Sequence, residues 1–245
     1  MDIGNLKRRE RLLSWIRKLY DTYENCRSEV GIAVDERTPL LPLSHTIVNA
    51  HIEITIDGFG NFKRARCLSK DEAITIAPCT EDSASRGAGN NPHALFDKLQ
   101  YVAGDYTCFF TDKRGKEYYQ EYMNLLESWC DSQFKDEKVR AVCSYLKKEC
   151  LIADLISNRL LDIDADNLVT NKWLGDKSNK PMKICDIFIR FAVEIAGDSH
   201  CRLWEILDIF EKYNKYYLST KSNYKLCYVQ GKDMLVTIKH QSKTR

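Results

Sequence analysis

A run of polar and small residues, RGAGNNPH (Arg86 to His93), has side-chain types that are suited to contacting nucleic acid. Asparagine amides can pair with adenine in the major groove and with base edges in the minor groove. Glycines allow the backbone to approach a partner closely and to adopt a positive φ. The run lacks the Gly-Lys-Ser/Thr of a nucleotide-binding P-loop, and an ordinary exposed turn is the alternative interpretation. The candidate contacts are Arg86, Gly87, Gly89, Asn90, Asn91 and His93.

A second group of candidate contacts lies in the preceding segment FKRARCLSK, which carries several cations and no acid. Lysine and arginine neutralise phosphates, and such contacts position a duplex without reading its sequence. With the alternation of a strand, Arg64 and Arg66 share one face, while Ala65 and Cys67 point the other way. A merely solvated charged face is the alternative interpretation. The cations of this segment are Lys63, Arg64, Arg66 and Lys70.

The sequence contains no pattern that favours catalysis or a bound cofactor. Neither Gly-x-Ser-x-Gly nor His-Glu-x-x-His occurs, and no set of acids has a spacing that singles it out. The 10 cysteines form no Cys-x-x-Cys pair, so we expect reduced thiols and no zinc site. The segment DIDADN (Asp162, Asp164 and Asp166) lacks the glycine that an EF-hand calcium loop requires. We therefore expect a non-catalytic protein without metal or cofactor. A nuclease site whose residues come together only in the folded protein would leave no pattern in the sequence.

Strands and hairpins must position the candidate residues. NAHIEITID (residues 49–57) alternates apolar with polar residues, which predicts a strand with one buried face. DGFGN supplies the glycines of a turn, and FKRARCL returns as the second strand of a hairpin. ICDIFIRFAVEI (residues 184–195) predicts a strand that places Phe191 on one face and Arg190 and Glu194 on the other. KLCYV and MLVTIKH predict a closing hairpin.

Helices are predicted where apolar residues recur every three or four positions. A stripe on a helix from Leu6 to Glu24 comprises Leu12, Ile16, Leu19, Tyr20 and Tyr23. Further helices are predicted over residues 116–132, from residue 136 onward, near 151–161 and over 201–217. Separate groups of strands and helices joined by hairpins are typical of an α+β fold. We expect an antiparallel, hairpin-rich sheet with an N-terminal helix and an inserted helical subdomain.

Three regions follow from this order of elements. Residues 1–112 would hold the N-terminal helix, the hairpin sheet and the Gly-rich recognition loop, and residues 113–182 the helical subdomain and a polar connector. Residues 183–245 would supply a strand, a helix and a hairpin returning to the sheet. The net charge of +2 is too small to indicate, by itself, a protein that binds nucleic acid. No apolar run approaches the roughly 20 residues of a membrane span, so we expect a cytoplasmic protein.

Three separated motifs resemble one protein family. They are the hairpin over residues 49–68, RGAGNNPHALFDKLQYVAGD (Arg86 to Asp105), and LCYVQGKD (Leu226 to Asp233) with His240 downstream. From about Ser14 to the last residue the chain resembles the large subunit of the type I-C CRISPR surveillance complex (Cascade). Members of that family continue past the LCYVQGKD segment. The resemblance therefore implies that the chain is an N-terminal portion.

The resemblance implies that the chain recognises the protospacer-adjacent motif of duplex DNA in antiviral defence. The recognition loop would comprise residues 86–91, with His93 to Asp97 as its anchor. Family loops often carry a polar residue between the two glycines, where this chain has Ala88. Implied partners are guide RNA (crRNA), the backbone subunits, the subunit that holds the guide 5′ end, and a helicase–nuclease recruited later. A metal-dependent nuclease acting on DNA or guide RNA, and a purely architectural subunit, are the alternatives.

Overall fold

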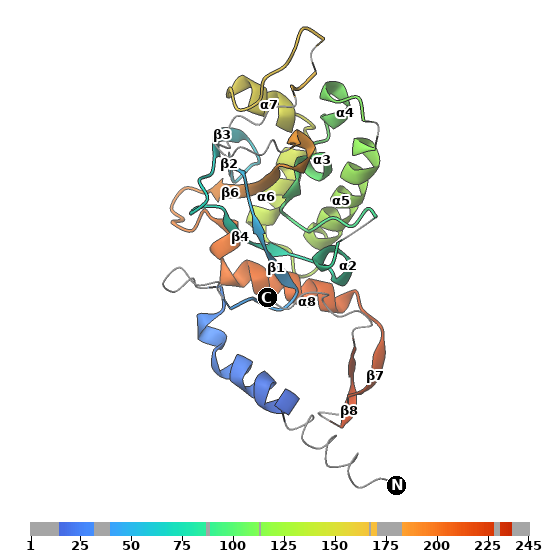
Figure 1. The fold of residues 1–245 in the computed structure, drawn as a ribbon. Helices are drawn as coiled ribbons and strands as arrows, with labels where there is room; N and C mark the ends of the chain where they lie inside the picture. The colour runs from blue at the N-terminus through green and yellow to red at the C-terminus, as the bar shows by residue number, and fades with distance from the viewer. Residues whose placement is uncertain are drawn as a thin grey trace.

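The structure is a computed structural model, and it describes residues 15–31, 40–86, 89–112, 114–166, 168–170, 183–227 and 231–236. Strands and helices occur in separate groups along the chain, and most of them pack into one body (Figure 1). The predicted α+β class and the N-terminal helix are confirmed. Within the described residues no helix is long and apolar enough to cross a membrane.

A four-stranded sheet with the order β3-β2-β6-β5 forms the centre of the body. Its strands are β2 (Ile52–Asp57), β3 (Phe62–Cys67), β5 (Asp97–Lys98) and β6 (Phe188–Glu194). The β2–β3 hairpin and the β5–β6 pair are antiparallel, as predicted, whereas β6 runs parallel to β2. A parallel pair needs a long crossover, and the chain between β2 and β6 supplies it with most of the helices. The sheet is therefore mixed.

Strand β2 is buried on both faces, which corrects the prediction of a single buried face. Ile52, Ile54 and Ile56 are inaccessible to solvent, and the intervening Glu53 and Thr55 are buried as well. Helix α6 (Glu137–Leu146) covers one face of β2 and β6. On the other face, β4 (Ile74–Pro78) and the 3-10 turn Leu203–Glu205 pack together. The predicted strand over 49–57 is interrupted at Ala50, because β1 (His45–Asn49) pairs with β4 in a separate two-stranded sheet.

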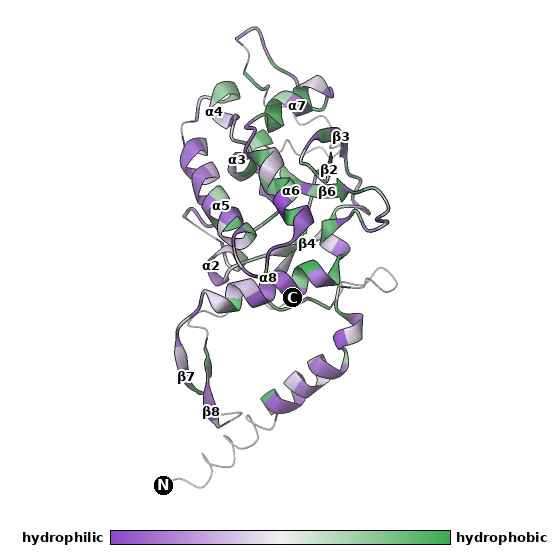
Figure 2. Ribbon diagram, turned by 180° about the vertical axis from the view of Figure 1, so that it is seen from behind, coloured by the Kyte–Doolittle hydropathy of each residue, from purple (hydrophilic) through white to green (hydrophobic). Residues whose placement is uncertain are grey.

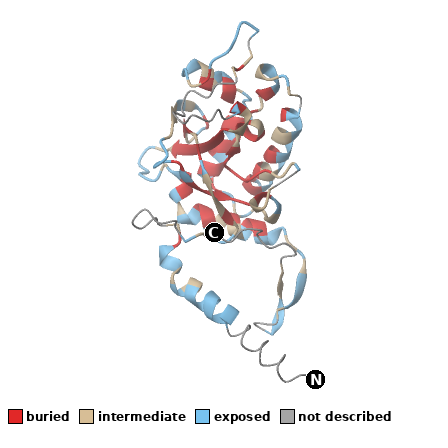
Figure 3. Cartoon of the chain, viewed as in Figure 1, coloured by how far each residue is buried: buried red, intermediate tan, exposed pale blue. Residues whose placement is uncertain are grey.

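Amphipathic helices complete the core. The two predicted stripes over residues 116–132 and from 136 onward correspond to α5 (Gly115–Cys130) and α6, and α7 (Leu151–Ser157) follows. Buried residues concentrate on the sheet and on the helix faces turned toward it (Figure 3). The remaining helical segments are α2 (Glu81–Ala84), α3 (Leu99–Val102), α4 (Tyr106–Phe109), α8 (Leu207–Ser219) and the 3-10 turns Arg27–Glu29 and Ile184–Asp186.

Two elements project from the same side of the body (Figures 1 and 2). One is the N-terminal helix, described over residues 15–25. The other is the hairpin of β7 (Tyr224–Cys227) and β8 (Lys232–Leu235), whose existence the sequence predicts correctly. The hairpin forms a two-stranded sheet of its own, so it does not return to the central sheet as expected.

Candidate nucleic-acid interface

The predicted recognition loop connects α2 with β5. Thr80 caps α2, because its side chain accepts a hydrogen bond from the Ser83 backbone while the Ser83 hydroxyl accepts one from the Thr80 backbone. This reciprocal cap fixes the direction in which the chain enters the loop. Of the predicted site, Gly87 and Ala88 lie outside the described residues, as does His240.

A buried ion pair closes the base of the loop. The Arg86 guanidinium donates to both carboxylate oxygens of Asp97, at 3.0 and 2.9 Å, and lies 5.1 Å from the centre of the Tyr101 ring. Asp97 also accepts from the backbone N–H groups of His93 and Lys98, each at 2.7 Å. Burial raises the pKa of Asp97, and Arg86 with the backbone donors acts in the opposite direction. Arg86 is therefore an anchor of the loop, since its donors face Asp97.

His93 is also an anchor. Its side chain is buried, and Nδ1 lies 3.0 Å from the Ser83 hydroxyl of α2. Burial, followed by the positive charges of Arg86 and Lys98, holds the pKa of His93 well below its ordinary value. The ring is therefore neutral at physiological pH. This placement agrees with the expectation that His93 to Asp97 hold the loop, but it removes the imidazole from the set of exposed contacts.

The described tip of the loop comprises Gly89, Asn90 and Asn91. Gly89 has a φ of +101°, a conformation that L side chains rarely adopt. The Asn90 amide donates to the Glu117 carbonyl of α5 at 3.3 Å, while its Oδ1 atom is buried without a partner among the described residues. The half-buried Asn91 side chain forms no hydrogen bond with any described residue. Asn91 is the predicted contact whose amide is best placed to pair with another molecule.

The hairpin cations are largely neutralised by carboxylates. Lys63 and Arg64 both pair with Glu194 of β6, the former at 2.8 Å, and they lower the pKa of Glu194 to about 2. Arg66 pairs with Glu53 at 3.0 Å and with Glu72 at 2.6 Å. These pairs are partly exposed, so each contributes little to stability and a phosphate can compete for the cations.

Lys70 differs from the other hairpin cations. Its side chain is exposed and forms no ion pair within the part of the chain that the structure describes. Lys70 is therefore the predicted cation that can contact a phosphate without first giving up a carboxylate.

The structure does not bring the loop and the hairpin cations together. In the order β3-β2-β6-β5, Lys63, Arg64 and Arg66 lie on one edge strand and Asp97 lies on the other. Three strand spacings of about 4.8 Å separate these edges, or roughly 14 Å. Figure 1 shows β3 and α2 on opposite sides of the body. The predicted residues therefore form two surfaces, one of which presents amides and the other cations.

The sequence interpretation missed a buried network between these edges. The alternation of its strand predicts a polar, solvent-facing position for Arg190 of β6, but Arg190 is buried and donates to Glu53 at 2.7 and 3.1 Å. The Trp204 ring centre lies 3.6 Å from its guanidinium carbon. Burial lowers the pKa of Arg190, and Glu53 opposes that shift. Opposite charges at the polar positions of two strands were the signal that could have identified the pair.

A metal centre is not evident in the part of the chain that the structure describes. No group of three or more His, Cys, Asp or Glu side chains is arranged there to hold an ion. The cysteines, all of which lie in that part, are free thiols. What the described residues offer chemically is hydrogen bonding and charge at the surface.

Comparison with known proteins places the chain in a family. Among proteins with curated descriptions, none matches the sequence. The family model described as CRISPR-associated protein (Cas_Csd1) matches residues 19–245, which is far more than half of the chain. The chain therefore belongs to the Cas_Csd1 family of CRISPR-associated proteins.

Proposed function

We propose that the chain acts in a type I-C CRISPR RNA-guided complex as the non-catalytic large subunit that recognises the protospacer-adjacent motif of duplex DNA. Membership of the Cas_Csd1 family supports a role in CRISPR defence and participation in a CRISPR complex. The observation that carries the finer proposal is the loop tip at Gly89–Asn91, which the Arg86–Asp97 pair and buried His93 hold at its base. A fixed base limits the entropy that the tip loses when it binds.

The two surfaces have different roles in this proposal. The Asn91 amide, and Asn90 once it leaves Glu117, would read base edges, because amides both donate and accept. Lys70 would contact the phosphate backbone, and Lys63, Arg64 and Arg66 would join it when phosphates displace their carboxylates. Contacts of this second kind position the duplex. Guide RNA pairing would then read the adjoining sequence, as in other RNA-guided effectors.

The test compares duplex binding by the reconstituted complex, which contains the other subunits and a guide RNA. A pool of duplexes with a randomised flank first identifies the preferred motif, and two duplexes that differ only in this motif are then measured at two salt concentrations. The double variant Asn90→Ala/Asn91→Ala should lose discrimination by about 5- to 150-fold, the value of one good amide–base contact. Asn124→Ala is the matched control, because it removes an exposed amide on α5.

The outcomes separate the possible roles of the two surfaces. Equal loss of affinity for both duplexes would reject base reading by the loop. Full retention of affinity and of motif discrimination would mean that the loop does not contact the DNA and that neighbouring subunits read the motif. Replacing Lys63, Arg64, Arg66 and Lys70 by alanine should weaken both duplexes equally and reduce the salt slope. An unchanged salt slope would show that these cations do not contact the DNA phosphates.

A further inference from the structure

The N-terminal helix exposes an apolar face that nothing in the described part of the chain covers. Trp15, Leu19 and Tyr20 are 60%, 57% and 50% exposed, and Ile16 is 38% exposed. Ile16, Leu19, Tyr20 and Tyr23 recur at the i, i+3, i+4 and i+7 positions of one helix face. Figure 3 shows this helix as an exposed element beyond the buried core. A contiguous apolar face of this kind marks an interaction site.

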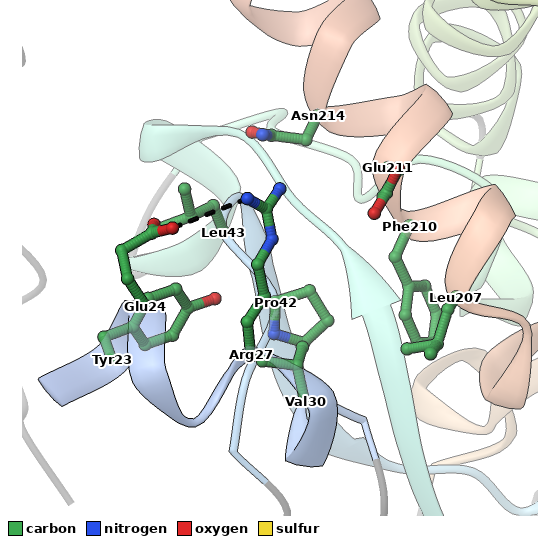
Figure 4. A pocket seen from close by; sticks show the side chains of 10 residues that line it. All are labelled: Tyr23, Glu24, Arg27, Val30, Pro42, Leu43, Leu207, Phe210, Glu211 and Asn214. Atoms are coloured by element: carbon green, nitrogen blue, oxygen red, sulfur yellow. Dashed lines mark hydrogen bonds and ion pairs between the residues drawn. The ribbon is translucent and has the colours of Figure 1, made fainter. Parts of the chain in front are cut away.

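The last member of this stripe reaches the body. The Tyr23 hydroxyl donates to the Leu41 carbonyl at 3.0 Å. Tyr23 and Arg27 also form one wall of a small pocket, and Leu207 and Phe210 of α8 lie opposite (Figure 4). The pocket holds about 90 Å³, enough for a small apolar group, and the exposed Leu43 lies at its edge. The helix stripe and the pocket therefore adjoin at Tyr23, and the pocket combines apolar lining residues with the polar Glu24, Arg27, Glu211 and Asn214.

The β7–β8 hairpin adds apolar residues on the same side of the body (Figures 1 and 2). Tyr224 and Leu226 lie on one face of the ribbon, and they are 61% and 51% exposed. The register pairs Tyr224 with Leu235 and Leu226 with Asp233, so the apolar face extends across both strands at the Tyr224–Leu235 pair. A two-stranded hairpin is marginally stable alone in water. The helix and the hairpin therefore both expose apolar side chains that a partner could bury.

The charges around this surface favour a protein partner. On the described helix, Arg17 and Lys18 are balanced by Asp21 and Glu24. A nucleic-acid site depends on an excess of cations, and a membrane-surface helix carries a strongly cationic polar face. Neither excess is present over residues 15–25, which carry the apolar stripe; the basic residues Lys7, Arg8, Arg9 and Arg11 precede this stretch in the sequence. Exposed tryptophan and tyrosine with a nearby arginine, here Trp15, Tyr20 and Arg27, are instead the residues enriched in protein interfaces.

We propose that the stripe Ile16–Leu19–Tyr20–Tyr23 and the adjoining pocket dock a neighbouring protein subunit of the CRISPR complex. The partner surface would be an apolar groove of low net charge that receives the helix, and one apolar side chain of its rim would enter the pocket. Helix-in-groove recognition uses this spacing of anchors. The β7–β8 face would contact the same subunit. This inference rests on the proposed function only in assuming assembly with other subunits, and it does not depend on how DNA is read.

The test measures binding of the full chain to the purified other subunits of the complex. Leu19→Glu/Tyr20→Glu places two charges on the stripe and should weaken binding about tenfold or more, as loss of central anchors does. Lys18→Glu is the matched control, because it changes the net charge equally on the opposite helix face and should have less than about a twofold effect. Circular dichroism melts should match wild type, since all three side chains are exposed.

Several outcomes would overturn the docking proposal. Wild-type binding by the double variant would do so, as would equal weakening by Lys18→Glu. Concentration-dependent dimers seen by light scattering and abolished by the double variant would identify a second copy as the occupant. Sedimentation with phosphatidylserine vesicles, or salt-dependent binding of guide RNA, abolished by the same variant would identify a membrane or nucleic acid. Normal assembly without motif discrimination would instead reject only the proposed DNA recognition.

Discussion

At the scale of single residues, Asp97 determines whether the recognition loop keeps its shape. This fully buried carboxylate accepts hydrogen bonds from Arg86, from the His93 backbone and from the Lys98 backbone. Replacing it with asparagine keeps the volume but leaves the Arg86 cation, whose side chain is 16% exposed, without a counter-charge. We expect Asp97→Asn to lower the free energy of unfolding by about 3 kcal/mol.

Urea denaturation measures this loss, and Asp112→Asn serves as its control. Asp112 also pairs with an arginine, Arg114, but both side chains are well exposed. An exposed pair contributes about 0–1 kcal/mol, so the control should remain near wild type. If the two variants lose similar amounts of unfolding free energy, the buried Arg86–Asp97 pair contributes no more to stability than an exposed pair does.

His45 makes stability depend on pH. Burial lowers its pKa from 6.5 to about 4, although a contact with the Leu43 carbonyl opposes the shift. Between these values the unfolded chain binds a proton that the folded protein does not, so acidification favours unfolding. The contribution of His45 should fall by about 2 kcal/mol from pH 7 to pH 5. His45→Phe, which keeps a ring beside Phe210 and Tyr213, should remove this part of the pH dependence.

The measurement compares chemical denaturation at pH 7 and pH 5 for wild type and variant. His200→Gln is the control, because it removes an imidazole whose side chain is 81% exposed. If His45→Phe loses as much stability on acidification as wild type does, His45 is not the group responsible. His93, the other buried imidazole among the described residues, would then be the one to replace.

At the scale of elements, the β2–β3 turn depends on a close approach to α6. Gly60 has a φ of +76°, and an added Cβ would lie 2.7 Å from the Ala141 carbonyl oxygen and 2.8 Å from the Tyr145 nitrogen. Lys148 reinforces the contact by donating to the Gly60 carbonyl at 2.7 Å. Gly60→Ala combines backbone strain with a clash against helix backbone. We expect it to cost about 3 kcal/mol of unfolding free energy.

Gly197→Ala separates the two causes. Gly197 has a similar φ of +84°, but an added Cβ there meets nothing within 4 Å. This control should therefore cost only the conformational strain, about 1 kcal/mol. Thermal or urea unfolding measures the stability of both variants. Equal losses of unfolding free energy would show that the turn can move away from α6.

Local pattern predicted many of these elements because each buries one face against the sheet. The stripes of α5 and α6 are of this kind, and Leu126 and Val142 are fully buried as their spacing implies. The second buried face of β2 could not be predicted in this way. It depends on the pairing of Glu53 with Arg190, which are 137 residues apart and look like solvent-facing positions in their own strands.

At the scale of the whole molecule, the position of β6 explains why the candidate site divides into two surfaces. In the sequence, the hairpin cations and the recognition loop follow one another closely. In the sheet, β6 lies between β2 and β5 and separates them. Sheet order depends on long-range pairing, which local spacing does not encode. The loop anchors were predicted in part, but Arg86 beside glycines fits a DNA contact as well as it fits a partner for Asp97.

Stability should be lowest in the two projecting elements. The N-terminal helix exposes its apolar face over the described residues 15–25, and the β7–β8 hairpin is a two-stranded sheet of its own, whereas β2 and β6 are bonded within a buried sheet. Backbone amides of residues 15–25 and of β7–β8 should therefore exchange with deuterium much faster than those of β2 and β6.

Assembly with the other subunits should slow exchange in the helix and the hairpin while leaving the central sheet unchanged. Mass spectrometry of peptides from the free and assembled protein measures this directly. The Leu19→Glu/Tyr20→Glu variant should show fast exchange under both conditions, because its stripe no longer docks. Slow exchange of both elements in the free protein would mean that their apolar faces are already covered without a second subunit.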